Sequence, residues 1–175
     1  MSERDGDLPG AWFEAIQRPS VRAALQGVYD MASREIGARG PACWASGRCC
    51  NFESAGHRLY VTGLEAAFVL ANRDAFELRD GSDPHAHPAR SVLSLQQLSD
   101  ARAAGGCPFQ RANLCGVHLI KPLGCRVYFC DRSAQQWQHD LSERLIGAIR
   151  AIHDEHAIVY RYAEWRDMLE RCVSA

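Results

Sequence analysis

The chain has 175 residues, of which 47% are hydrophobic and 23% charged, and its formal net charge is −1. This length predicts one domain, and the balanced charge argues against the basic surface typical of nucleic-acid-binding proteins. No stretch approaches the roughly 20 apolar residues that cross a bilayer, and the acidic, polar start lacks the pattern of a signal peptide. We therefore expect a cytoplasmic protein with no membrane or nucleic-acid partner, in which a disordered tail at 1–10 precedes a single domain at 11–175.

Two helices are expected before the first cysteines. A short one covers 11–17. The second begins at Pro19, because proline suits the first helical position. Apolar residues continue at helical spacing to Ile36, and Gly37 and Gly40 end the helix. We interpret this helix as scaffold, with one face packed and the other solvated.

The next part of the chain alternates loop and helix. Residues 41–52 carry the first cysteine group and read as a loop, and 58–62 form a short extended piece. Thr62 and Glu65 match a capping box, in which each side chain would bond the backbone N–H of the other. The apolar run that follows predicts a helix at 63–73.

The second half is expected to be helical around an irregular cysteine-containing segment, with Ser133 as the N-cap of the longest helix. The expected elements are a loop at 79–90, helices at 92–103, 134–154 and 160–172, and turns with short extended pieces at 107–130. Aromatic residues at helical spacing are assigned to the core: Trp137, Tyr162 and Trp165. The histidines near these helices are assigned to the surface: His139, His153 and His156. The fold class expected is mainly α, a small irregular helical domain whose loops are organised by a metal-bound cysteine cluster.

Seven of the eight cysteines lie in two glycine-rich segments, and these seven are the predicted metal ligands. They are Cys43, Cys49, Cys50, Cys107, Cys115, Cys125 and Cys130. Thiolates bind zinc and iron tightly, and a reducing cytoplasm keeps thiols unpaired unless a metal holds them. Nearby glycines let a loop curl and point N–H groups at sulfur. Buried apolar thiols and a disulfide framework are the alternatives, and Cys172 on the last helix fits the first of these.

The order and flanking residues of these cysteines resemble a known family. The first segment fits CxxCxxCC with Ser46 at the second cysteine position, and the second contains Cys107-Pro-Phe, Cys115, Lys-Pro-Leu-Gly-Cys125-Arg and Cys130. The chain thus resembles the YkgJ-type cysteine-cluster family, a zinc- or iron-chelating domain, over roughly residues 40–170. The resemblance implies metal binding and assigns no reaction. A flagellin lysine methylase with a related cysteine domain, thought to use an iron–sulfur cluster, is an analogy only.

Ser46 leaves the nature of the metal open. Two tetrahedral zinc ions would need a water, Ser46, a histidine or a bridging cysteine to complete eight bonds. A single [4Fe–4S] cluster takes four cysteines and would tolerate the serine. The adjacent Cys49 and Cys50 point to opposite sides of an extended loop, which favours a polynuclear site. His57 and His118 lie near the cysteines and are weaker candidates, because surface hydrogen bonding is the commoner role of such histidines.

Three functions are compatible with such a cluster. An iron–sulfur cluster would support redox chemistry or modification of a protein side chain. Zinc would hold together a module that binds a protein partner. A labile cluster would buffer or deliver metal. No acid–base pair or phosphate-binding loop is recognisable, so enzymatic activity and catalytic residues are left open.

Overall fold

A computed structural model describes residues 8–42, 46–76 and 93–174. These parts of the chain contain eight α-helices, four short β-strands and one 3-10 helix. The prediction of a mainly α fold is therefore confirmed. None of the described helices has both the length and the apolar character that a membrane span requires. The predicted loop at 79–90, with His85 and His87, lies outside the described residues.

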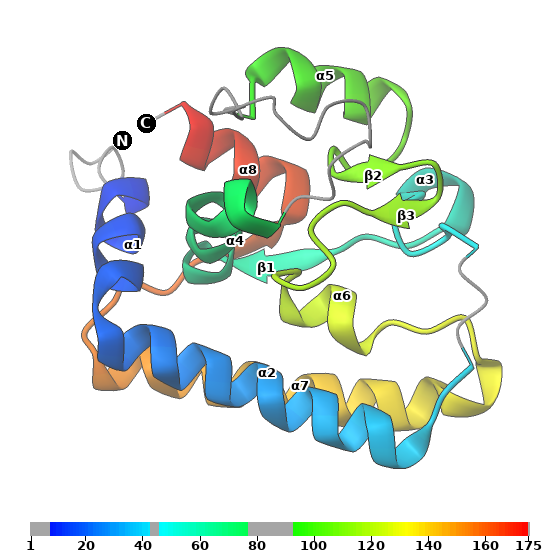
Figure 1. Cartoon of the computed structure of the whole chain (residues 1–175), viewed down its shortest axis with the longest axis horizontal. Helices are drawn as coiled ribbons and strands as arrows, with labels where there is room; N and C mark the ends of the chain where they lie inside the picture. The colour runs from blue at the N-terminus through cyan, green and yellow to red at the C-terminus, as the bar shows by residue number, and fades with distance from the viewer. Residues whose placement is uncertain (1–7, 43–45, 77–92, 175) are drawn as a thin grey trace.

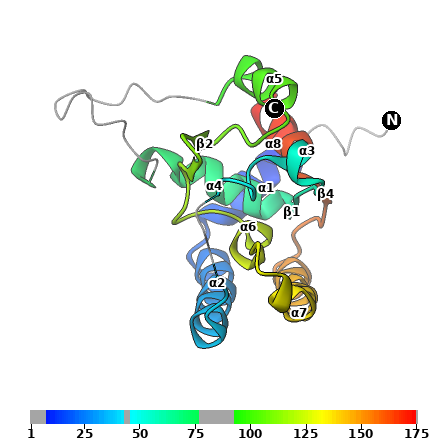
Figure 2. The same cartoon turned by 90° about the vertical axis from the view of Figure 1, so that its right-hand side faces the viewer.

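Two long helices form one layer of the molecule. The helices α2 (Pro19–Arg39) and α7 (Gln135–Glu155) lie side by side in all three views (Figure 1, Figure 2). Glu35 and Arg144 join them through an ion pair with contacts of 2.6 and 2.9 Å. A short helix, α6 (Leu123–Val127), packs against both and carries Cys125. The α2–α7 layer thus supports one of the cysteines from below.

The first helices begin and end differently from the prediction. The helix α1 (Leu8–Gln17) starts inside the predicted tail, because Pro9 occupies the first turn, where its missing N–H is not needed. Residues 1–7 of that tail lie outside the described residues. α2 begins at Pro19 as predicted, but Gly37 lies within it. Gly40 ends the helix with a φ of 59°, a conformation that glycine adopts without strain.

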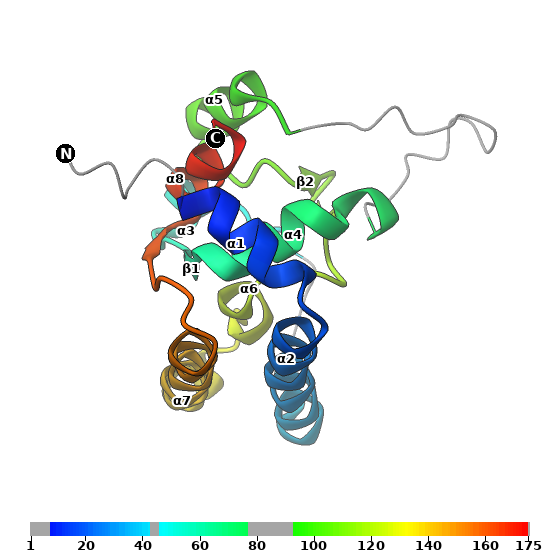
Figure 3. The ribbon, with the colours of Figure 1, turned by 90° about the vertical axis from the view of Figure 1, so that its left-hand side faces the viewer.

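The capping box predicted for the central helix is confirmed. In α4 (Gly63–Phe76), the Thr62 N–H donates to Glu65 Oε2 at 2.9 Å, and the Glu65 N–H donates to Thr62 Oγ1 at 3.3 Å. α1 crosses α4 closely (Figure 3). A Cβ at Gly63 would lie 2.3 Å from the Trp12 indole, so the two helices can approach only with glycine there.

A two-stranded sheet joins distant parts of the chain. The strand β1 (Tyr60–Thr62) pairs antiparallel with β4 (Tyr162–Glu164). The prediction of a helix from residue 160 is therefore wrong, since α8 spans Trp165–Val173. The Glu164 carboxylate accepts the N–H groups of Arg166 and Asp167 and so caps the helix at this point.

The remaining elements are short. They are α3 (Phe52–Ala55), α5 (Leu95–Ala103), β2 (Gln110–Arg111), β3 (Leu114–Cys115) and a 3-10 turn at Arg132–Ala134. α3 lies partly within the predicted loop at 41–52. Ser133 lies inside the 3-10 turn and does not cap α7. Asp131 instead accepts the Ser133 N–H at 2.9 Å and starts the turn.

Three side-chain assignments change with the tertiary structure. Trp165 is buried as predicted, but Trp137 is half-buried and Tyr162 is exposed. His153 was expected at the surface and is instead buried, with its Nδ1 3.3 Å from the carbonyl oxygen of Ile158. The chain turns back on α7 immediately after this helix, and the turn covers the ring.

Candidate metal centre

The two cysteine segments meet through their backbones. The Cys107 N–H donates to the Cys50 carbonyl oxygen at 2.8 Å. The Gln110 amide nitrogen donates to the Gly47 carbonyl oxygen at 3.2 Å. Gly47 has a φ of 71°, and a Cβ there would lie 2.8 Å from the Gln110 side chain. Glycine therefore allows the first loop to dock on the second segment.

A tight hairpin places the next cysteine. The strands β2 and β3 pair so that Cys115 lies opposite Gln110. Ala112 and Asn113 at its tip have φ angles of 45° and 66°. Positive φ at both central residues is the geometry of the two-residue turns that match strand twist. The hairpin thus carries Cys115 back towards the Cys49–Cys50 turn.

The sulfur atoms of four cysteines interact with one another. Cys49 Sγ lies 3.9 Å from Cys50 Sγ. The pKa of Cys50 is raised, first by hydrogen bonding with Cys107 and Cys115, then by hydrogen bonding with Cys49 and by burial. All the cysteines that the structure describes are free thiols. We call Cys49, Cys50, Cys107 and Cys115 the four-thiol group.

Its members favour the thiolate form. Hydrogen bonding with Cys50, and secondarily the charge of Lys121, lowers the pKa of Cys49 to about 6 against the effect of burial. Hydrogen bonding with Cys50, the Val117 N–H and Lys121 together lower the pKa of Cys115 to about 7. The thiolate is the form that binds metals.

Backbone N–H groups point at two of the sulfurs in the same way. The Phe109 N–H bonds the sulfur of Cys107, and the Val117 N–H bonds the sulfur of Cys115. In both cases the donor stands two residues after the cysteine. Such N–H donors offset the negative charge that accumulates when several thiolates share a metal.

Trp165 adds a contact that sequence reasoning missed. The pKa of Cys107 is lowered first by Cys50 and then, against the effect of burial, by the Phe109 N–H and the Trp165 indole. The indole Nε1 is buried and has no hydrogen bond of good geometry within the described residues. The sequence pattern gives Trp165 only a core role, and no local signal connects it with a cysteine 58 positions earlier.

The remaining predicted ligands lie at different places. Cys125 interacts electrostatically with Cys107, Cys115 and Cys49, and burial raises its pKa well above the ordinary range. Cys130 is placed against Ser46, with 3.7 Å between sulfur and hydroxyl oxygen. Cys43 lies outside the described residues. The prediction that all seven cysteines bind metal therefore divides into a four-thiol group, an adjacent Cys125, and a separate Cys130.

The two candidate histidines differ in their surroundings. His57 stacks on Tyr128 with 4.4 Å between ring centroids, and its Nδ1 is buried without a described hydrogen-bond partner. It lines a cleft together with Cys49 and Cys125. His118 is exposed, and nearby Lys121 lowers its pKa. Of the two, His57 is closer to the thiols.

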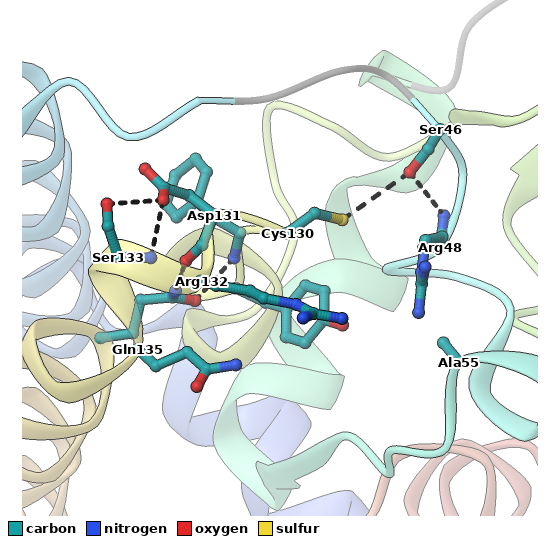
Figure 4. A pocket seen from close by; sticks show the side chains of 11 residues that line it. Ser46, Arg48, Ala55, Cys130, Asp131, Arg132, Ser133 and Gln135 are labelled. Carbon is teal, nitrogen blue, oxygen red and sulfur yellow. Dashed lines mark hydrogen bonds between the residues drawn. The ribbon is translucent and has the colours of Figure 1, made fainter.

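Cys130 opens onto a separate cavity of about 810 Å³ (Figure 4). Arg48 and Arg132 lie on its walls, and Ser46 accepts the Arg48 N–H at 3.4 Å while facing Cys130. Ser46 therefore occupies a position next to a cysteine, as the family signature implies for this site.

The donor atoms do not surround a common point in this structure. Within the described residues, no three Cys, His, Asp or Glu side chains are arranged to hold a metal ion. The thiols of the four-thiol group instead interact with one another, with Cys50 common to the interactions. Metal binding would require these side chains to turn outward from Cys50.

The chain matches no protein-family model, no curated protein and no solved structure. The resemblance to the YkgJ-type cysteine-cluster family therefore stays a prediction that rests on the cysteine spacing. Any function must be argued from the chain's own side chains.

Proposed function

We propose that the chain binds a metal through cysteine thiolates, either iron as an iron–sulfur cluster or zinc. The observation that carries the proposal is the four-thiol group, in which free thiols from two distant segments interact. Four thiolates are the ligand number of one tetrahedral zinc ion or one [4Fe–4S] cluster. Thiols stay unpaired in the reducing cytoplasm that we propose as the compartment.

The separation of the first two sulfurs suits a shared ion. Two thiolates that each lie about 2.3 Å from a tetrahedral zinc are about 3.8 Å apart. Cys49 and Cys50 are 3.9 Å apart. Adjacent cysteines can therefore face one ion when the loop turns sharply, as it does after Gly47. This relation weakens the preference for a polynuclear site that was drawn from their adjacency alone.

The charge of the group also favours a cation. Lys121 is the basic side chain that acts on Cys49, Cys115 and Cys125 alike. One ammonium cannot balance several thiolates in a partly buried site. A bound cation would supply the missing positive charge and would free Cys50 to ionise, because its proton would no longer be shared between sulfurs.

The residues fit a metal chemically, but their side chains must rearrange. Turning a cysteine side chain between rotamers costs little, of the order of 1 kcal/mol. Metal binding by thiolates is far more favourable, about 10 kcal/mol or more for structural zinc. The rearrangement therefore does not oppose binding. Bound iron–sulfur would supply electron transfer, and bound zinc would stabilise the loops.

The decisive experiment is metal analysis of matched cysteine variants of the full chain, purified without oxygen. The wild type should contain stoichiometric iron with acid-labile sulfide, or stoichiometric zinc. Cys107→Ala should lose most of the metal. Cys172→Ala is the matched control, since that buried thiol lies on α8 outside the group, and it should retain all of the metal.

The colour of the protein separates the alternatives. A brown protein with broad visible absorption would support the redox function. A colourless zinc protein that unfolds when the metal is chelated would support the structural module. Rapid loss of metal to a chelator without unfolding would support buffering or delivery. A wild type without bound metal, or a Cys107→Ala variant with full metal content, would contradict the proposal.

Ser46→Cys tests which cysteines are needed. If the four-thiol group is the whole site, this variant should bind the same amount of metal as the wild type. If two zinc ions share eight cysteine positions, the new thiol beside Cys130 should raise the amount of zinc bound.

A further inference from the structure

Three tyrosines form an exposed aromatic surface beside the thiols. We call Tyr60, Tyr160 and Tyr162 the tyrosine face. Tyr60 and Tyr162 are 43% and 45% exposed, although tyrosine rings are mostly covered in folded proteins. Their centroids are 5.7 Å apart, and Tyr160 stacks on Tyr162 at 6.4 Å. In Figure 2 the strand β4 lies at the edge of the molecule, above α7.

A cleft of about 260 Å³ begins at this face and ends at the thiols. Tyr60 and Tyr162 line it from the sheet, and His139 lines it from α7. Cys49 lies farther along the same cleft, with His57 and Cys125. The volume suits one large side chain rather than a drug-sized ligand, for which pockets of roughly 300–1,000 Å³ are usual.

The charges around the face are mainly positive. Arg58 lines the cleft, and the Arg150 guanidinium lies 4.5 Å from the centre of the Tyr160 ring. The cleft lining contains no Asp or Glu among the described residues. Glu143 is the surface carboxylate whose charge reaches Tyr162. The face therefore attracts negative charge, with Glu143 acting against the two arginines.

We propose that the tyrosine face docks an acidic segment of a partner protein, which inserts one large apolar or aromatic side chain into the cleft. Tyrosine and arginine are the residues that most often carry the binding energy of protein interfaces. Tyrosine also gives a large contact area at a low cost in side-chain entropy. A segment bound there would cover the side of the thiols formed by Cys49 and Cys125. The proposal does not require a bound metal.

The test selects peptides from a random display library against the full chain and measures the most enriched peptide by fluorescence anisotropy. The enriched sequences should be rich in Asp and Glu and contain an aromatic or large apolar residue. Tyr162→Ala should weaken binding of that peptide by about tenfold or more, the size typical of a central interface tyrosine.

Two charge variants should act in opposite directions. Arg150→Gln should weaken binding by about two- to fivefold, and Glu143→Gln should strengthen it by a similar factor. Both residues are exposed on α7, so neither change threatens the fold if Tyr162→Ala does. Arg171→Gln, an exposed arginine on α8, is the matched control and should leave binding unchanged.

Several outcomes would overturn the proposal. Enrichment of neutral or basic peptides would show that charge does not select the partner. Equal enrichment on the wild type and Tyr162→Ala would place the binding site elsewhere. Changes of the same sign in Arg150→Gln and Glu143→Gln would do the same. Self-association that depends on Tyr162 would assign the face to a second copy of the chain.

Discussion

Glu65 connects the central helix to the segment that carries Cys125, and its removal should be costly. The carboxylate is buried and accepts the Leu123 N–H at 2.8 Å, the Thr62 N–H at 2.9 Å and the Thr62 hydroxyl at 3.0 Å. Glu65→Ala would leave two buried N–H groups without an acceptor. Each such group costs about 1–3 kcal/mol, so we expect a total loss of about 3–5 kcal/mol.

The matched control is Gln97→Ala. Gln97 occupies the same position in the capping box of α5, where its side chain accepts the Ser94 N–H at 2.9 Å. That box is exposed, so water replaces the lost bond. We expect the control to cost only about 0.5–1 kcal/mol.

Urea unfolding of metal-free protein, followed by circular dichroism, measures both losses. The unfolding midpoint of Glu65→Ala should fall several times further than that of Gln97→Ala, and its thermal midpoint by about 10 °C or more. Equal losses in the two variants would refute the reasoning. The Leu123 N–H would then gain nothing from Glu65, and the capping box alone would account for its role.

Three further predictions concern packing, pH and thiol reactivity. Gly63→Ala should destabilise the fold by about 1–3 kcal/mol, because its Cβ would overlap an indole. Gly27→Ala, with nothing within 4 Å, should stabilise it by up to about 1 kcal/mol, so equal thermal midpoints would contradict the predicted clash. Burial lowers the pKa of His153, so the unfolded chain takes up the proton first as the pH falls below about 6.5. The free energy of unfolding should therefore fall with the pH below that value and should fall less steeply in His153→Gln, as pH-dependent urea unfolding would show. In metal-free protein at pH 7, Cys49, with a pKa of about 6, should react with iodoacetamide much faster than buried Cys172, whose pKa burial raises to about 12. Peptide mapping by mass spectrometry measures both rates, and equal rates would contradict the thiolate assignment.

Local signals predicted the helices because each depends on residues within one or two turns. Pro19 begins α2, and Gly40 ends it with a positive φ. Thr62 and Glu65 form the capping box that their spacing predicts. These bonds are made within four positions of the chain, so a sequence pattern contains both partners.

Long-range packing decided what the pattern left open. Pairing of β1 with β4 turned the expected start of the last helix into a strand and exposed Tyr162, because the partner strand lies about 100 residues away. His153 is buried by a turn that follows its helix, which helical spacing does not describe.

The amino-acid sequence by itself determined that seven cysteines stand in two glycine-containing segments, since residue type and spacing are properties of the chain alone. Only the tertiary structure decided which sulfurs interact. Cys107 and Cys115 meet Cys49 and Cys50, whereas Cys130 lies against Ser46. The reason is that hydrogen bonds between loops and the tight turn of a hairpin bring thiols together, and spacing along the chain does not specify those contacts.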